Sequence, residues 1–359
     1  MTVLVTGATG FVGSAVVRRL IGAGYTVRVL VRRGSDLRNL DGLDVELAEG
    51  DLTQPETLGR AVRGSRGLFH AAADYRLWVR DRAAMFAANV EGTRSLMSAA
   101  LEAGVERIVY TSSVGTLGIV NGGVADEKTP VRFDDMIGPY KQSKFLAEAA
   151  VRELFEVRGL SVVIVNPSTP IGPRDIKPTP TGKIVLDAAS GRIPAFVDTG
   201  LNVVHIDDVA DGQLKAYECG VPGERYILGG DNLELSEILA QIARLCGRRA
   251  PTIRLPHAAV LPLAAAAEGW CRVFGGEPFA TIDGARMSRK RMFFSSEKAK
   301  AALGYAPRPA IDALRDALAY YHGQGTITVR AFARGGDGMH PQAGPVWSSA
   351  PTAAKKTTD

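Results

Sequence analysis

A tyrosine and a lysine four residues apart, Tyr140 and Lys144, are the pair best suited to chemistry in this sequence of 359 residues. An apolar helical pattern follows them, and four residues are just over one helical turn, so both side chains share a face. Because a nearby cation favours a charged phenolate, Lys144 is predicted to lower the pKa of Tyr140 from about 10. Such a phenol can pass a proton to or from a carbonyl or alcohol oxygen.

A predicted strand ends in two serines, of which Ser113 is 27 residues before Tyr140. Ser113 stands where side chains at the end of a parallel strand face the ligand crevice of α/β proteins. Alone, a Tyr–Lys pair could be a surface pair, and a serine-rich strand end could cap itself. Together with the glycine turn described next, they indicate an active site.

Three glycines, Gly7, Gly10 and Gly13, lie between an apolar strand and an amphipathic helix. Gly7 permits a sharp turn, Gly10 exposes backbone to a pyrophosphate, and Gly13 allows close helix packing. The N–H groups and the positive dipole end of the following helix attract phosphates. The spacing G-x-x-G-x-x-G therefore predicts a dinucleotide site.

The elements that must position these residues alternate along the chain. Strand-like runs cover residues 3–6, 27–31, 45–49, 68–72, 107–112 and 162–166. Helical periodicity fills the gaps, notably over 11–23 and over 85–103, which ends at Gly104. Continuous apolar strands alternating with helices indicate a parallel sheet covered on both faces. The predicted fold class is α/β, a Rossmann-type doubly wound parallel sheet with a smaller C-terminal substrate lobe.

The pattern changes after residue 167, where prolines cluster and helical segments (208–219, 235–246 and 311–321) alternate with loops. We predict an NAD(P)-binding Rossmann domain from residues 1–166 with parts of 195–230. Residues 167–324 are predicted to form most of a non-contiguous substrate-binding lobe. The Gly-, Ser- and Thr-rich residues 325–359 are predicted to be a disordered tail.

Composition excludes several classes of protein. Apolar residues make 46% and charged residues 23% of the chain, as in soluble globular proteins. The 43 basic and 38 acidic residues are too balanced to predict nucleic-acid binding. The densest basic cluster is interpreted as a solvated turn, with a substrate diphosphate or an anionic membrane surface as alternatives; it contains Arg286, Arg289, Lys290 and Arg291.

The three cysteines, at 219, 246 and 271, form no C-x-x-C motif, so we predict reduced, mostly buried thiols and no metal site. The longest apolar run, residues 258–267, contains Pro262 and is shorter than the roughly 20 residues of a membrane span. It is predicted to be a helix buried against the protein or a partner. Because the sequence begins directly with a strand, we expect a cytoplasmic protein; peripheral membrane contact and a homodimer stay open.

The glycine turn, the serine-rich strand end and the Tyr140–Lys144 pair together resemble extended short-chain dehydrogenases/reductases of the NAD-dependent epimerase/dehydratase superfamily. The resemblance covers residues 1 to about 322. Similar proteins include dihydroflavonol 4-reductases, 3β-hydroxysteroid dehydrogenases and nucleotide-sugar epimerases. Four idiosyncratic segments resemble the hopanoid-associated sugar epimerase group: His70–Trp78, Asp135–Lys141, Val165–Pro180 and Phe293–Ser296. The resemblance implies an NAD(P)-dependent oxidoreductase/epimerase linked to hopanoid (lipid) biosynthesis.

The resemblance also implies roles for individual residues. Tyr140 would be the acid/base, Ser113 would hydrogen-bond the substrate oxygen, and Lys144 would lower the tyrosine pKa and hold the nicotinamide ribose. Ser112 is the alternative serine. The implied cofactor-binding residues are Gly7, Thr9, Gly10, Phe11, Val12, Gly13, Arg32, Arg33, Asp51, Leu52, Ala71, Ala72, Ala73, Asn89, Thr111, Tyr140, Lys144, Pro167, Ser168 and Thr169.

One departure from the family pattern concerns the cofactor. NAD-preferring members end the second strand with an acidic residue, where this chain has Val31 followed by Arg32 and Arg33. With no carboxylate there, and with guanidinium groups suited to a phosphate, the cofactor is predicted to be NADP(H), with NAD(H) as the alternative. Such an arginine pair could also simply face solvent.

Three functions are consistent with these residues. The first is an oxidoreductase/epimerase acting on a sugar, a sugar-lipid or an amphipathic ketone or alcohol. The second is an NADPH-dependent ketone reductase of the dihydroflavonol or steroid type, and the third a non-catalytic NADP-sensing protein. Residues 74–82, 114–137 and 170–204 are predicted to line the substrate pocket. His70 and His205 are interpreted as structural, with Asp207 or Asp208 as a helix N-cap.

Overall fold

The computed structural model describes residues 1–329, apart from 77, 80, 277 and 279. Its centre is a seven-stranded sheet in which every neighbouring pair is parallel. In spatial order the strands are β3 (Glu46–Glu49), β2 (Thr26–Val31), β1 (Thr2–Thr6), β4 (Gly67–His70), β5 (Arg107–Thr111), β6 (Val162–Pro167) and β10 (Arg225–Leu228). The order reverses between β1 and β4, which confirms the doubly wound fold and leaves a crevice at their carboxyl ends.

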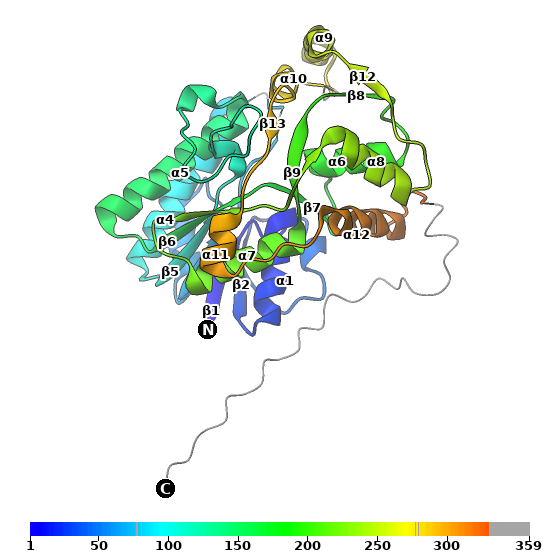
Figure 1. Cartoon of the computed structure of the whole chain (residues 1–359). Helices are drawn as coiled ribbons and strands as arrows, with labels where there is room; N and C mark the ends of the chain where they lie inside the picture. Colours follow the sequence, from blue (N-terminus) through cyan, green and yellow to red (C-terminus); the bar gives the residue numbers. More distant parts are fainter. Residues whose placement is uncertain (77, 80, 277, 279, 330–359) are drawn as a thin grey trace.

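Helices cover both faces of this sheet (Figure 1). One face packs on α1 (Phe11–Gly22), α7 (Ile206–Cys219) and α11 (Glu297–Leu303). The other packs on α2 (Pro55–Val62), α4 (Gly92–Glu102) and α5 (Gly138–Arg158). Successive residues of β1 alternate between the two cores, with Val3 and Val5 on one side and Leu4 on the other. An unbroken apolar strand is what a sheet buried on both faces requires.

A second, smaller assembly lies beyond the carboxyl ends of the large sheet (Figure 1). In it β9 (Gly200–His205) pairs with β7 (Thr169–Ile171), β11 (Asp231–Glu234) and β13 (Arg291–Met292). Helices α6 (Pro180–Ala189), α8 (Leu235–Leu245) and α12 (Ala310–Gly323) enclose its own core. The short strands β8 (Ala195–Val197) and β12 (Ile253–Leu255) form a separate pair. The chain returns to the large sheet through α7, β10 and α11, and the exact domain boundaries stay a prediction.

Two helical predictions differ from the structure. The periodicity over 85–103 corresponds to α3 (Arg82–Phe86), a π-helical turn (Ala87–Glu91) and α4. The apolar run 258–267 lies in α9 (His257–Phe274), which packs beside α10 (Ile282–Met287). Most of this run is not buried against the described chain, because α9 buries only Ala264, Ala267, Glu268 and Cys271. Burial against a partner stays a prediction.

The predicted start of the disordered tail, at residue 325, is too early in the sequence. Ile327 and Val329 are buried in the core around α12, and the Thr326 N–H donates to the Tyr321 carbonyl at 3.0 Å. Residues 330–359 lie outside the described residues. The cysteines are free thiols, with Cys246 and Cys271 buried and Cys219 exposed. In the described part of the chain, no helix has both the length and the apolar character needed to cross a bilayer.

Candidate active site

The glycine turn at the end of β1 is packed backbone against backbone. Gly7 has a φ of +71°, and a Cβ there would lie 2.6 Å from the nitrogen of Ala72. A Cβ on Gly13 would lie 2.1 Å from the carbonyl oxygen of Gly7. Both positions therefore exclude any side chain. A Cβ on Gly10 would be less crowded, with the Gly7 carbonyl oxygen at 3.3 Å.

The start of α1 is open to an anion. Gly10 precedes the helix without a side-chain cap, and the first turn contains no acidic residue. The N–H groups of Phe11, Val12 and Gly13 thus meet the conditions for holding a phosphate. These residues fit the pyrophosphate of a dinucleotide cofactor.

The ends of β4, β5 and β6 bring further predicted residues to the same edge. Thr6 pairs with His70, and Thr111 pairs with Val165, so the loops that follow these strands start side by side. These loops contain Ala71–Ala73, Ser113 and Pro167–Thr169. Among the described residues, the buried hydroxyl of Ser168 has no hydrogen-bond partner. A buried polar group without a partner fits a site where a ligand completes the bonding.

The predicted catalytic residues meet at this edge. Tyr140 is partly buried in the first turn of α5, and the Ser113 hydroxyl forms a side-chain hydrogen bond with it. The same serine caps a short turn by accepting from the N–H of Gly115 at 3.0 Å. Lys144 is buried one turn further along α5, where its Nζ donates to the Tyr110 hydroxyl at 3.0 Å and to the Thr111 carbonyl at 2.8 Å.

Burial dominates the electrostatics of this pair. It raises the pKa of Tyr140, although the hydrogen bond with Ser113 opposes the shift. It lowers the pKa of Lys144 to about 7, although Glu148 opposes the shift. The prediction that Lys144 lowers the tyrosine pKa therefore fails in this structure. Desolvation disfavours both charged forms, and the ammonium is bonded to β5 rather than to the phenol.

The buried carboxylate of Glu148 accepts hydrogen bonds from the loop that contains Ser112 and Ser113 and from β6. Its Oε2 accepts from Ser112 at 2.5 Å, from Thr116 at 3.0 Å and from Asn166 at 3.2 Å. Asn166 also donates to the Ser113 carbonyl at 3.0 Å. Ser112 is thus held away from the crevice, whereas Ser113 is at Tyr140.

Sequence reasoning missed Glu148 and Asn166. The available signal was an acidic residue four positions after Lys144, on the same helix face, and an amide within the apolar strand β6. Two partly exposed arginines, Arg152 and Arg225, pair with the other oxygen of Glu148, each at 3.4 Å.

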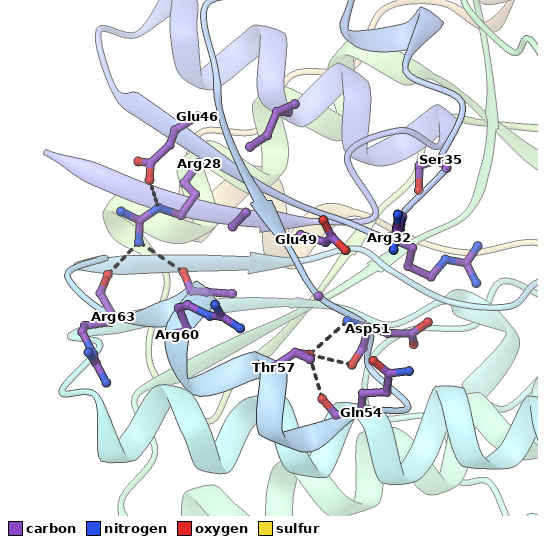
Figure 2. Close-up of a pocket in the computed structure, with 16 residues that line it drawn as sticks. Arg28, Arg32, Ser35, Glu46, Glu49, Asp51, Gln54, Thr57, Arg60 and Arg63 are labelled. Atoms are coloured by element: carbon purple, nitrogen blue, oxygen red, sulfur yellow. Dashed lines mark hydrogen bonds and ion pairs between the residues drawn. The ribbon is translucent and has the colours of Figure 1, made fainter.

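A pocket of about 990 Å³ opens where β2 and β3 end. Its lining includes Arg32, Ser35, Glu49, Asp51 and Thr57 (Figure 2). The side chains of Arg32 and Arg33 are exposed and form no ion pair or hydrogen bond with any described residue. They are free to bind a ligand phosphate.

The same pocket corrects one premise of the cofactor prediction. Glu49 lies directly opposite Val31 in the strand register, so a carboxylate does occupy this end of the sheet, on β3 instead of β2. Arg28, deeper in the pocket, is paired with Glu46 at 2.9 Å and bonded to the Arg63 carbonyl at 2.6 Å (Figure 2). Arg32 and Arg33 directly follow Val31, the strand partner of Glu49, and neither side chain forms an ion pair with a described residue.

Several predicted cofactor residues have partners within the chain. Asn89 is buried in the π-helical turn, accepts from the Asp74 N–H at 2.7 Å and donates to the Ser143 hydroxyl at 2.9 Å. It holds the loop after β4 against α5. Three others contact protein groups as follows: the Thr9 carbonyl accepts from Asn39, the Thr111 hydroxyl donates to Gln213, and Leu52 lies against Gly92.

The two histidines are structural, as predicted. His70 hydrogen-bonds Thr6 at 2.7 Å and Thr93 at 2.9 Å, and burial lowers its pKa to about 3. His205 itself is the N-cap of α7, since its Nδ1 accepts from the Asp207 N–H at 3.0 Å. The prediction of Asp207 or Asp208 as N-cap is wrong, because their carboxylates are bonded to arginines of other segments.

Helices α9 and α10 lie close to segments that are predicted to line the substrate pocket. A Cβ on Gly138, two residues before Tyr140, would lie 2.9 Å from a carboxylate oxygen of Asp283 in α10. The Arg272 guanidinium of α9 lies 5.7 Å from the Trp78 ring centre. Of the segments predicted to line the substrate pocket, 74–82 thus contacts α9 through Trp78. The segment 114–137 ends directly before Gly138, which lies against α10. Within the described residues, no group of three or more His, Cys, Asp or Glu side chains could hold a metal ion.

Comparison with known proteins adds a family. Residues 3–229 match the family described as "NAD dependent epimerase/dehydratase family". A putative dihydroflavonol 4-reductase of Synechocystis sp. is 42% identical over 328 residues, which are 90% of this chain and 95% of that protein. Sterol demethylase protein B of Methylococcus capsulatus is 36% identical over 91% of this chain and 100% of its own length. The crystal structure of gox2253 superposes with a TM-score of 0.83 at 54% identity, covering 91% of this chain and 99% of that one.

Proposed function

The chain belongs to the NAD dependent epimerase/dehydratase family of oxidoreductases, and we propose that it reduces a ketone on a polycyclic, largely apolar substrate with NADPH. The observation that carries the proposal is the hydrogen-bonded pair of Ser113 and Tyr140 beside the glycine turn. The names of the two relatives, a putative dihydroflavonol 4-reductase and a sterol demethylase protein, support a polycyclic substrate. The link to hopanoid biosynthesis that the sequence resemblance implies stays a prediction. It is compatible with this proposal, because hopanoids are lipids and a largely apolar substrate is proposed.

The proposed roles follow from the geometry. A bound nicotinamide cofactor supplies the hydride for the carbonyl carbon. Ser113 donates a hydrogen bond to the carbonyl oxygen, and Tyr140 donates the proton as that oxygen becomes an alcohol. Because burial raises the pKa of Tyr140, the phenol is protonated at neutral pH, as a proton donor must be. Lys144, which is bonded to β5, would contact the ribose in this proposal.

The activity test follows the cofactor through the reaction. Purified protein is incubated with NADPH and a panel of ketones (dihydroflavonol, steroid and hopanoid) and with nucleotide-linked sugars. Stoichiometric loss of NADPH absorbance with a polycyclic ketone supports the reductase. Sugar epimerisation without net NADPH loss would instead establish the epimerase alternative, and cofactor binding without any turnover would leave a sensor.

The assigned proton donor is tested by substitution. Tyr140→Phe is expected to lower kcat by about 10²–10⁴-fold while the Kd for NADPH stays unchanged. Tyr25→Phe is the matched control, because the Tyr25 hydroxyl is bonded to Glu218, remote from the site, and its loss leaves kcat unchanged. A Tyr140→Phe protein that keeps its turnover would refute the proposed mechanism.

The NADPH preference rests on Arg32 and Arg33 and is opposed by Glu49. The double variant Arg32→Ala/Arg33→Ala should weaken NADPH binding by about tenfold or more and leave NADH binding unchanged. Arg60→Ala, an exposed arginine lining the same pocket, is the control that leaves both affinities unchanged. If NADH binds the unaltered protein as tightly as NADPH, the preference is wrong and Glu49 outweighs the arginines.

A further inference from the structure

Helix α9 carries an apolar stripe that no described part of the chain covers. Trp270, Val273 and Phe274 are 65%, 75% and 68% exposed, and Leu263 lies on the same face two turns earlier. The rings of Trp270 and Phe274 are packed together, with centroids 4.2 Å apart. The opposite face of α9 is buried, so the helix is anchored while its stripe faces outward. Contiguous exposed apolar side chains of this kind mark an interaction site.

The charge around this stripe identifies its partner. Residues 248–291 contain eight Lys and Arg but only three Asp and Glu. Three of these arginines, Arg272, Arg286 and Arg291, are paired with carboxylates. Arg254 in β12 and Arg289 after α10 are exposed and form no ion pair with any described residue. A second copy of the chain would have to bring the same positive segment against this one. An anionic surface is the complementary partner.

We propose that α9 docks on an anionic lipid bilayer, with the stripe of Leu263, Trp270, Val273 and Phe274 entering the headgroup region and the flanking arginines on the lipid phosphates. Aromatic and aliphatic residues on one face of a helix, with basic residues beside them, are the pattern of helices that lie in this interface. The apolar stripe and the two unpaired arginines are on neighbouring elements. Arg289 follows α10, which packs against α9, and Arg254 is in β12, directly before α9 begins.

The position of α9 gives docking a consequence for the proposed reaction. Arg272, on α9, lies over Trp78, and α10 contacts Gly138 just before Tyr140. An apolar substrate dissolved in the bilayer would therefore meet the protein beside the predicted substrate segments. This consequence rests on the proposed function, whereas docking itself does not.

The test is co-sedimentation of the full chain with vesicles of mixed phosphatidylglycerol and phosphatidylcholine, and of phosphatidylcholine alone. The protein should sediment with the anionic vesicles, less so as salt is raised. Trp270→Ser/Phe274→Ser and Arg254→Gln/Arg289→Gln should each weaken this binding by about tenfold or more. Val157→Ser/Val221→Ser, which replaces similarly exposed apolar residues elsewhere, is the matched control that binds like the unaltered chain.

Three results would overturn the proposal. One is a failure to sediment with anionic vesicles. Another is an equal loss of binding in the Val157→Ser/Val221→Ser control. The third is a dimer without vesicle binding that dissociates in Trp270→Ser/Phe274→Ser, because the stripe would then be covered by a second copy. NADPH binding by the stripe variant should stay unchanged, so a failure here is separable from a failure of the proposed reductase.

Discussion

The carboxyl edge of the large sheet and the α9–α10 region place their side chains by opposite means. At the sheet edge, Gly7 and Gly13 leave no room for a Cβ, and buried polar groups are bonded to one another around Glu148. In α9, a Cβ on Gly269 would meet no atom of the described chain within 4 Å, and large apolar side chains face outward. The comparison indicates that tight packing is concentrated where atoms must be held for chemistry, whereas α9 leaves large apolar side chains uncovered by the described chain.

Two buried glutamates, one in each region, test this difference most strongly. Glu148→Gln should lower the free energy of unfolding by about 3 kcal/mol, because it breaks ion pairs and a network with several donors. Glu268→Gln should lower it by only about 1 kcal/mol, because the amide oxygen can still accept from the Ile282 N–H. Urea denaturation of both variants gives the two values. Equal losses would remove the distinction between the regions.

Two helical glycines sharpen the comparison because the same substitution should have opposite effects. Gly13→Ala should lower the free energy of unfolding by about 2 kcal/mol, since the new methyl group meets a backbone carbonyl that has little freedom to move. Gly269→Ala should raise it by up to about 1 kcal/mol through better helix propensity in open space. NADPH titration should show weakened binding for the first variant only. Stabilisation by Gly13→Ala would contradict the packing described at this turn.

The active site should also show a stability cost that depends on pH. Lys144 has a pKa of about 7 in the folded protein, against 10.5 when unperturbed. Between these values the unfolded chain holds a proton that the folded chain lacks, so the free energy of unfolding rises with pH, by about 1.4 kcal/mol per unit at most from this group. Denaturation across this window should give a shallower rise for Lys144→Met. An unchanged slope would show that Lys144 does not titrate there.

The smallest effect is expected on the exposed stripe. Trp270→Ser should change the free energy of unfolding by less than about 0.5 kcal/mol, because this side chain contributes little to the packed core. Phe69→Ser is the contrasting variant, since Phe69 is fully buried and its replacement should unfold a large fraction of the protein. Circular-dichroism melts separate the two. A large loss in Trp270→Ser would mean that α9 is held by contacts on its outer face.

Much of the fold could be predicted because its signals are local. Apolar runs such as Val3–Thr6 read as buried parallel strands, and the spacing of Gly7, Gly10 and Gly13 places a turn and a helix start within a residue or two. Strand order also places Ser113 at this edge, since the ends of parallel strands share it. The meeting of Ser113 with Tyr140, a helix residue, is implied by the family resemblance instead.

Features that depend on pairing or burial could not be predicted from the sequence. Glu49 is opposite Val31 only because of the strand register. The pKa of Tyr140 depends on how much water is excluded around it, which no spacing reports. His205 replaces an aspartate as N-cap because both neighbouring carboxylates are bonded to distant arginines. An apolar run such as 258–267 predicts a helix but says nothing of what covers it.

The repeated passage of the chain between the two sheets has a mechanical consequence. It leaves the large sheet after β6, returns at α7, leaves again after β10, and returns once more for α11 before it enters the core around α12. Neither half is a continuous piece of polypeptide, so no single linker acts as a hinge. Relative movement must keep every crossing intact, which favours a small twist over a wide opening. A cut in one exposed crossing is expected to leave a nicked protein whose fragments stay together, held by the remaining crossings and the shared core.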